Sequence, residues 1–254
     1  MHSACPVDAQ NGISLKELIR SKRKILPMTD DKKFSLVGVW FAVSCVVPLL
    51  RDGFNGIAVT TLLALAYFLL SLFWFFTRGR SLKIKNPGRT FIMGCTVNAM
   101  AVEVFHMISK PLNDSLLVTQ HTPVGLAIRN TLIDLLLTFP AYILIFSVIW
   151  YLLRRYQYAP FSFFFLMALG QALGDGQAFF LSNPVTLIFI PYVMINYWAM
   201  NFVPYLMVRH ALEGEPRKGK VMKIILPVIS LPLTYFVAAA VILTVGASLG
   251  WIPK

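Results

Sequence analysis

Seven long apolar runs alternate with short polar segments along the sequence, and this alternation leaves few folds open. A helix of about 20 apolar residues crosses the hydrocarbon core of a bilayer. Hydrophobic residues make up 57% of the 254 residues and charged residues only 13%, which excludes an ordinary soluble domain. The sequence predicts an all-α polytopic membrane bundle, with helices at about 34–50, 57–77, 91–108, 126–153, 160–181, 185–208 and 222–249.

The predicted number of membrane spans is seven, and six is the alternative. The first run is short, and the last run contains Pro227 and Pro232. Residues 1–33 are polar and basic and contain no long apolar stretch, so we expect a cytosolic tail there. Residues 34–254 would then form the membrane bundle.

The positive charges predict how the bundle is oriented. With the first residue in the cytosol, 19 of the 23 Lys and Arg residues fall in cytosolic segments and 4 do not. This asymmetry favours an N-in, C-out topology by the positive-inside rule. Because the charges lie between apolar runs, the net charge of +12 does not indicate a nucleic-acid groove. The three cysteines have no spacing typical of a metal site or a disulfide framework.

The third to sixth runs carry polar side chains that are expensive to bury in hydrocarbon and are therefore functional candidates. Glu103 and His106 lie about 60° apart on one helix face, so they could share a proton. Under the predicted topology the ionisable candidates lie at similar depths in the non-cytosolic half of the bilayer, so we expect one shared cavity. The catalytic candidates are Glu103, His106, Asp134 and Asp175, and the substrate-binding candidates are Asn130, Thr138, Gln171, Tyr192, Asn196 and Trp198.

A structural role for these side chains is the alternative. Asp134 could pair with Arg129, and Glu103 with Lys110, near the membrane interface. Asn and Gln side chains can also join helices by hydrogen bonds, and a lone histidine often serves helix packing. The glycines of the fifth run would let either a neighbouring helix or a flat ligand approach the backbone closely.

Two strings in the fifth and sixth runs resemble the emopamil-binding protein family, whose members share the EXPERA domain. They read Gly170-Gln171-x-x-Gly174-Asp175 and Tyr192-x-x-x-Asn196-x-Trp198. The resemblance covers about residues 57–210 and implies a sterol Δ8-Δ7 isomerase or a related lipid-pathway protein. It also implies the endoplasmic reticulum membrane as the location.

The resemblance assigns roles residue by residue. Glu103 and Asp134 resemble two helix carboxylates of the family, and Asn196 resembles its asparagine. Trp198 lies one residue closer to that asparagine than the family tryptophan does. The larger departure is Ala99, one turn before Glu103, where the isomerases carry a histidine.

The seven-span layout with a buried glutamate also resembles, more weakly, the fungal membrane-bound terpene cyclases. The last run, 222–249, has no acidic residue where those cyclases carry one.

These patterns predict a membrane enzyme that isomerises or cyclises a sterol or terpenoid through a carbocation. Such chemistry needs an acid, a base and walls that favour positive charge in a dry cavity, with no metal or organic cofactor. Glu103, aided by His106, would transfer the proton, and Asp134 and Asp175 would stabilise the cation. The expected partners are the lipid substrate and membrane lipids, and a homodimer is left open.

Two other classes of function remain open at this stage. The first is a non-catalytic binder of sterols or cationic amphiphiles, which the alanine at position 99 favours. The second is a receptor or transporter. The predicted cytosolic N-terminus, the lack of a lysine within the last span and the lack of an inverted repeat all count against this second class.

Overall fold

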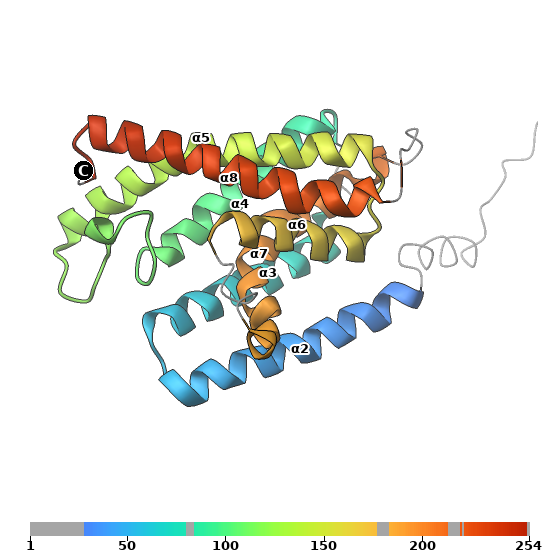
Figure 1. Ribbon diagram of the computed structural model, residues 1–254, viewed down its shortest axis with the longest axis horizontal. Helices are drawn as coiled ribbons and strands as arrows, with labels where there is room; N and C mark the ends of the chain where they lie inside the picture. Colours follow the sequence, from blue (N-terminus) through green and yellow to red (C-terminus); the bar gives the residue numbers. More distant parts are fainter. Residues whose placement is uncertain (1–27, 80–83, 177–182, 213–218, 220, 253–254) are drawn as a thin grey trace, which may run out of the picture.

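The computed structural model describes residues 28–79, 84–176, 183–212, 219 and 221–252, and within these ranges all regular structure is helical (Figure 1). The predicted all-α class is confirmed. The longer helices are α2 (Met28–Asp52), α3 (Gly56–Thr77), α4 (Pro87–His106), α5 (Val124–Arg155), α6 (Pro160–Gly174), α7 (Ile190–Val208) and α8 (Met222–Ser248). The short 3-10 helices η2 (Asp114–Leu116), η4 (Pro184–Phe189) and η5 (Arg209–Leu212) lie between them. Most of the predicted tail, residues 1–27, lies outside the described residues.

Five helices in the described ranges are long and apolar enough to cross a membrane, which confirms a membrane-embedded helical bundle. They are α2, α3, α5, α8 and the continuous helical stretch Pro184–Leu212 that contains α7. Helix α6 has only 15 residues, and α4, with 20 residues, does not contain a stretch apolar enough to be counted with these five. The count of seven spans therefore stays a prediction.

Helix α8 shows the surface that such a bundle presents to lipid. Ile229, Leu233 and Phe236 follow one another at helical spacing and are 59%, 62% and 73% exposed. Side chains at this spacing share one helix face. A stripe of large exposed apolar side chains is what a lipid-facing helix requires and what a soluble domain avoids.

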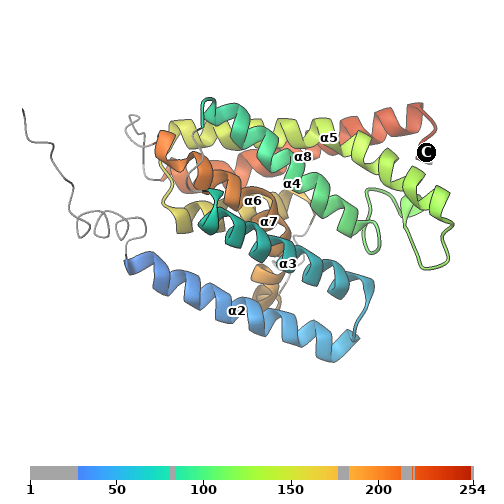
Figure 2. The same cartoon turned by 180° about the vertical axis from the view of Figure 1, so that it is seen from behind.

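Helix α7 lies at the centre of the bundle. It contacts α2, α3, α4 and α6, while α4, α5, α8 and α6 contact one another in that order around it (Figures 1 and 2). Most of its side chains are buried, including Asn201 and Tyr205. Because its sequence is apolar on every side, α7 is suited to a position enclosed by other helices.

Glycines bring α6 and α8 into close contact. A Cβ atom on Gly170 would lie 2.6 Å from the carbonyl oxygen of Pro227, and one on Gly174 would lie 2.8 Å from the Cβ of Tyr235. A side chain at either position would therefore force the two helices apart. The close approach that the glycines of this run permit is thus made by a neighbouring helix.

Two prolines inside the helices leave carbonyl groups without a helical donor, and side chains from other segments replace that donor. Pro204 has no N–H to offer the carbonyl of Met200, which accepts a 3.1 Å hydrogen bond from Asn98 Nδ2 instead. Pro227 likewise cannot serve the carbonyl of Lys223, which accepts a 3.0 Å hydrogen bond from the hydroxyl of Tyr158. The prolines are therefore accommodated by contacts between segments distant in sequence.

The ends of the helices agree with an odd number of passes through the bundle. The start of α2 and the start of α8 lie at one end of the molecule, and the last helical turn of α8 lies at the opposite end (Figures 1 and 2). Arg209 and Lys223 both line a small cavity at the first end, beside Tyr158. Arg209 and Lys223 thus lie at the end of the bundle opposite to the one at which α8 finishes. The orientation of the bundle in the membrane stays a prediction.

Candidate functional site

A polar cavity of about 210 Å³ lies between α4, α5, α7 and α8, next to the end of α6. It brings together five of the predicted site residues from three helices and the turn after α6. They are Glu103, His106, Thr138, Asp175 and Asn196. The other groups in its wall include Lys110, Tyr142, Tyr197, Met200 and Tyr235.

Glu103 reaches this cavity from α4 and is held there by a tyrosine of α5. The hydroxyl of Tyr142 donates a hydrogen bond to Glu103 Oε1. The Tyr142 ring is buried and stacks on Phe146, with ring centroids 5.9 Å apart. The packed tyrosine fixes one oxygen of the carboxyl group and leaves the rest of the group facing the cavity.

Asp175 supplies the second carboxyl group of the cavity. It lies directly after the last residue of α6, and its backbone N–H donates to the carbonyl of Gln171. The hydroxyl of Tyr197 donates a 2.8 Å hydrogen bond to Asp175 Oδ2. Glu103 is partly buried and Asp175 is exposed, so the cavity has one carboxyl group in its interior and another at its rim.

Gln171 lies behind the cavity wall rather than in it. Its side-chain carbonyl accepts a hydrogen bond from Asn201, and its Nε2 donates to the hydroxyl of Tyr235 at 3.2 Å. The side chain is completely buried. Gln171 therefore joins α6, α7 and α8 and holds the ring of Tyr235 at the cavity.

His106 and Asn196 lie in the wall between this cavity and a second one. The second cavity, of about 300 Å³, is formed by the ends of α2, α3 and α4 together with α7, and it also contains the predicted residue Tyr192. His106, Asn196, Lys110 and Tyr197 line both cavities. His106 Nε2 and Asn196 Oδ1 are buried and have no hydrogen-bond partner.

Asp134 and Asn130 bind the chain between α4 and α5 instead of facing the cavity. Asp134 Oδ1 accepts a 2.8 Å hydrogen bond from the backbone N–H of Leu112, and Asn130 Nδ2 donates to the carbonyl of Leu116 at 3.3 Å. The carbonyl of Asp134 in turn accepts a hydrogen bond from Thr138. Helical spacing had placed Asp134 on the face of the predicted site, but the connecting segment folds back and covers it.

Trp198 and Ala99 belong to the apolar core. The indole N–H of Trp198 donates to the carbonyl of Phe164 at 3.0 Å, and the two rings stack with centroids 4.1 Å apart. Ala99 has no exposed surface and packs in the same core. The site therefore has no titratable group at position 99, where the resembled isomerases carry a histidine.

Sequence reasoning did not single out Tyr142 or Tyr235 as site residues. Each lies in a strongly apolar run, where an aromatic side chain is expected to pack in the core or face lipid. The hydroxyl group is the feature that could have indicated them, because a buried Tyr hydroxyl usually has a polar hydrogen-bond partner. Each of these tyrosines meets a candidate residue from another helix.

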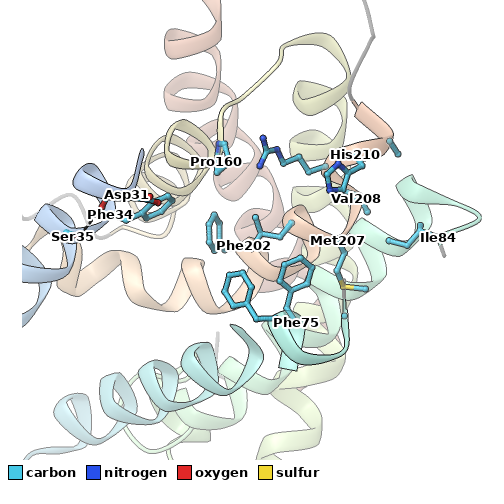
Figure 3. Close-up of a pocket in the computed structure, with 15 residues that line it drawn as sticks. Asp31, Phe34, Ser35, Phe75, Ile84, Pro160, Phe202, Met207, Val208 and His210 are labelled. Atoms are coloured by element: carbon cyan, nitrogen blue, oxygen red, sulfur yellow. Dashed lines mark hydrogen bonds between the residues drawn. The ribbon is translucent and has the colours of Figure 1, made fainter. Parts of the chain in front are cut away.

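A larger cavity, of about 630 Å³, lies at the other end of the bundle, and its described lining contains none of the predicted site residues. Phe34 of α2, Phe75 of α3 and Phe202 of α7 surround it, and His210 lies at its edge (Figure 3). Asp31 is the only acidic side chain among its described lining residues. Its described lining is therefore mainly apolar, with four Phe side chains and no pair of carboxyl groups.

Within the described ranges no group of three or more His, Cys, Asp and Glu side chains is placed to hold a metal ion. No known protein family, curated protein or solved structure matches this chain.

Proposed function

We propose that this chain is a membrane-embedded enzyme that moves a carbon–carbon double bond, or closes a ring, in a sterol or terpenoid by adding a proton at one carbon and removing one at another. The observation that carries this proposal is the pair of carboxyl groups, Glu103 and Asp175, at one small cavity inside an apolar bundle. Each is hydrogen-bonded by a tyrosine from a different helix. The resemblance to sterol isomerases supports the same class of reaction.

Glu103 is the proton donor in this reaction. Burying a charge without a counter-charge is costly, so a carboxyl group in the wall of a lipid-filled cavity is best accommodated as the neutral acid. Its proton adds to one carbon of the double bond, and positive charge forms on the other carbon. The rings of Tyr142, Tyr197 and Tyr235 line the cavity and can stabilise that charge.

Asp175 is the proton acceptor. Its carboxylate removes a proton from a carbon next to the cation, and the electrons of that C–H bond form the new double bond. Asp175 is exposed, so it can release the abstracted proton to water, and Glu103 takes a proton back from water. The enzyme is therefore unchanged after one cycle. Asp134 has a structural role, because it binds the segment between α4 and α5. It is also close enough to Glu103 to act on it electrostatically.

The test is deuterium transfer from heavy water. Membranes containing the protein are incubated in heavy water with Δ8-sterols and polyprenyl epoxides, and recovered lipids are analysed by mass spectrometry. We expect deuterium in product formed by the unmodified protein, and none with Glu103→Gln, which retains lipid binding within about tenfold because the shape of the group is kept. Asp114→Asn is the matched control, since this exposed carboxyl group lies in η2 and should leave deuterium uptake intact.

A non-catalytic lipid binder is the second candidate, and Ala99 is the observation that favours it. The buried alanine leaves the site without the histidine of the resembled isomerases. A lipid that is bound but recovered without deuterium, by the unmodified protein and by Glu103→Gln alike, would refute the enzyme and establish the binder.

A further inference from the structure

We propose that the wall between the two neighbouring cavities is a binding site for the hydroxyl group of a lipid alcohol whose apolar body lies in the 300 Å³ cavity, so that its hydroxyl-bearing end faces the 210 Å³ cavity. The inference rests on the proposed function, because it names the class of substrate that binds at the same site. It is carried by two buried polar atoms that the fold leaves unpaired, His106 Nε2 and Asn196 Oδ1.

Several other polar groups in the wall of the larger cavity are paired within the protein. In the wall of the larger cavity, the hydroxyl of Thr60 donates to the carbonyl of Phe105 at 2.9 Å, and that of Thr61 donates to the carbonyl of Ile57 at 2.9 Å. Asn55 Oδ1 accepts from the first turn of α3. Buried polar atoms are nearly always paired, so an unpaired donor and acceptor beside a cavity point to a missing ligand.

The two atoms lie on neighbouring side chains. His106 is in the last turn of α4, Asn196 is in α7, and both side chains line both cavities. The side chain of Asn196 interacts with that of His106, yet His106 Nε2 and Asn196 Oδ1 themselves lack a hydrogen bond of good geometry. We infer that one small polar group bound at this wall would satisfy both atoms.

A hydroxyl group has the composition that this pair requires. Asn196 Oδ1 can only accept a hydrogen bond, whereas His106 Nε2 can donate one when it carries a proton. A hydroxyl donates one hydrogen bond and accepts others, so it satisfies both atoms at once. A ketone can only accept, and a hydrocarbon leaves both atoms unpaired.

The remaining wall of the larger cavity suits an apolar lipid body. Pro48, Ile57, Ala58, Phe189 and Val193 line it, and they come from α2, α3, the end of η4 and the start of α7. Ligand pockets are typically lined by apolar side chains with a few placed polar groups that fix orientation. The two cavities meet at Asn196 and Tyr197, so the hydroxyl-bearing end of a lipid held there would lie next to the cavity that contains Glu103.

The test compares three lipids of one skeleton in purified Glu103→Gln protein, which cannot transfer the proton. A Δ8-sterol, its 3-ketone and its 3-deoxy hydrocarbon are each equilibrated with the protein in detergent micelles, and bound lipid is quantified by mass spectrometry. A polyprenyl alcohol, its aldehyde and its hydrocarbon form a second series. We expect the alcohol to bind at least tenfold more tightly than the hydrocarbon, with the carbonyl compound between them, since the hydrocarbon leaves a buried donor and acceptor unsatisfied.

Two substitutions check that this preference depends on the unpaired atoms. Asn196→Leu and His106→Phe should each reduce the preference for the alcohol to about threefold or less, since each removes one of the two polar atoms. Asn113→Leu is the matched control because Asn113 lies in the segment before η2 and lines neither cavity, so it should keep the preference. Folding of each variant is followed by gel filtration in detergent, and Asn196→Ala, which also removes the acceptor, replaces Asn196→Leu if the latter aggregates.

The outcomes separate this inference from the proposed function. Equal affinity for alcohol and hydrocarbon in both lipid series would overturn the inference, whether or not the unmodified protein incorporates deuterium. A preference for the alcohol together with no deuterium uptake would support the inference and refute the enzyme. Loss of the preference in Asn113→Leu would also count against the site, because that residue does not reach it.

Discussion

Replacing Asn98 with leucine is expected to destabilise the bundle, and to do so much less when Pro204 is also replaced by alanine. Asn98 Nδ2 donates to the carbonyl of Met200, which Pro204 leaves without a helical donor. In Asn98→Leu this carbonyl has no partner, whereas in the double variant the backbone N–H of residue 204 can donate to it. The structure thus predicts energetic coupling between two residues that are 106 positions apart.

The size of this coupling follows from the hydrogen bonds that change. Leaving a buried carbonyl unpaired costs about 1–3 kcal/mol in soluble proteins, whereas side-chain hydrogen bonds within membrane bundles average about 0.6 kcal/mol. We therefore expect a coupling free energy of about 1 kcal/mol. The loss of the 2.8 Å hydrogen bond from Tyr67 to Asn98 occurs in both backgrounds and cancels. The loss of packing between Pro204 and Gly94 cancels in the same way.

The assay is a double-mutant cycle on the free energy of unfolding, measured by titration with SDS in mixed micelles. The unmodified protein, Asn98→Leu, Pro204→Ala and the double variant are compared under identical conditions. Additive effects within about 0.3 kcal/mol would refute the reasoning, because they would show that Asn98 does not replace the donor missing at Pro204. A coupling of the opposite sign would refute it as well.

Two further predictions concern the contacts that α8 makes with α6 and with the segment just before α6. Gly170→Ala should lower the free energy of unfolding by about 1–3 kcal/mol, because its Cβ would lie 2.6 Å from the carbonyl oxygen of Pro227 and 2.9 Å from Leu231. Tyr158→Phe should cost about 1 kcal/mol, because the carbonyl of Lys223 would lose the donor that compensates for Pro227. Both are measured by the same SDS titration.

Matched controls separate these effects from general loss of packing. Gly38→Ala in α2 meets no neighbouring atom within 4 Å and should be neutral or stabilising, since alanine favours a helix over glycine by about 1 kcal/mol. Tyr151→Phe changes an exposed tyrosine and should be close to neutral. If Gly170→Ala behaved like Gly38→Ala, the close approach of α6 to α8 would be wrong. An equal cost for Tyr151→Phe and Tyr158→Phe would remove the role assigned to the Tyr158 hydroxyl.

The candidate site shows which functional residues local sequence patterns can identify and which they cannot. Helical spacing and the cost of burying charge pointed to Glu103, His106, Asp175 and Asn196, and the structure brings these four together at one cavity. The same reasoning selected Asp134, which turned out to bind the backbone of the segment between α4 and α5. The spacing of residues on one helix defines a face, but it does not say which other segment covers that face.

The all-helical class and the approximate positions of the helices came from the sequence alone, because apolar composition over about 20 residues is a local property that a bilayer or a bundle interior must satisfy. The sequence also determined that carboxyl groups would lie inside an apolar bundle. Only the tertiary structure decided that α7 is enclosed by its neighbours, that Tyr142 and Tyr197 bind the two carboxyl groups, and that His106 and Asn196 share a wall. These contacts join residues from separate helices, so they depend on how helices pack against one another, and no local pattern in the chain specifies that arrangement.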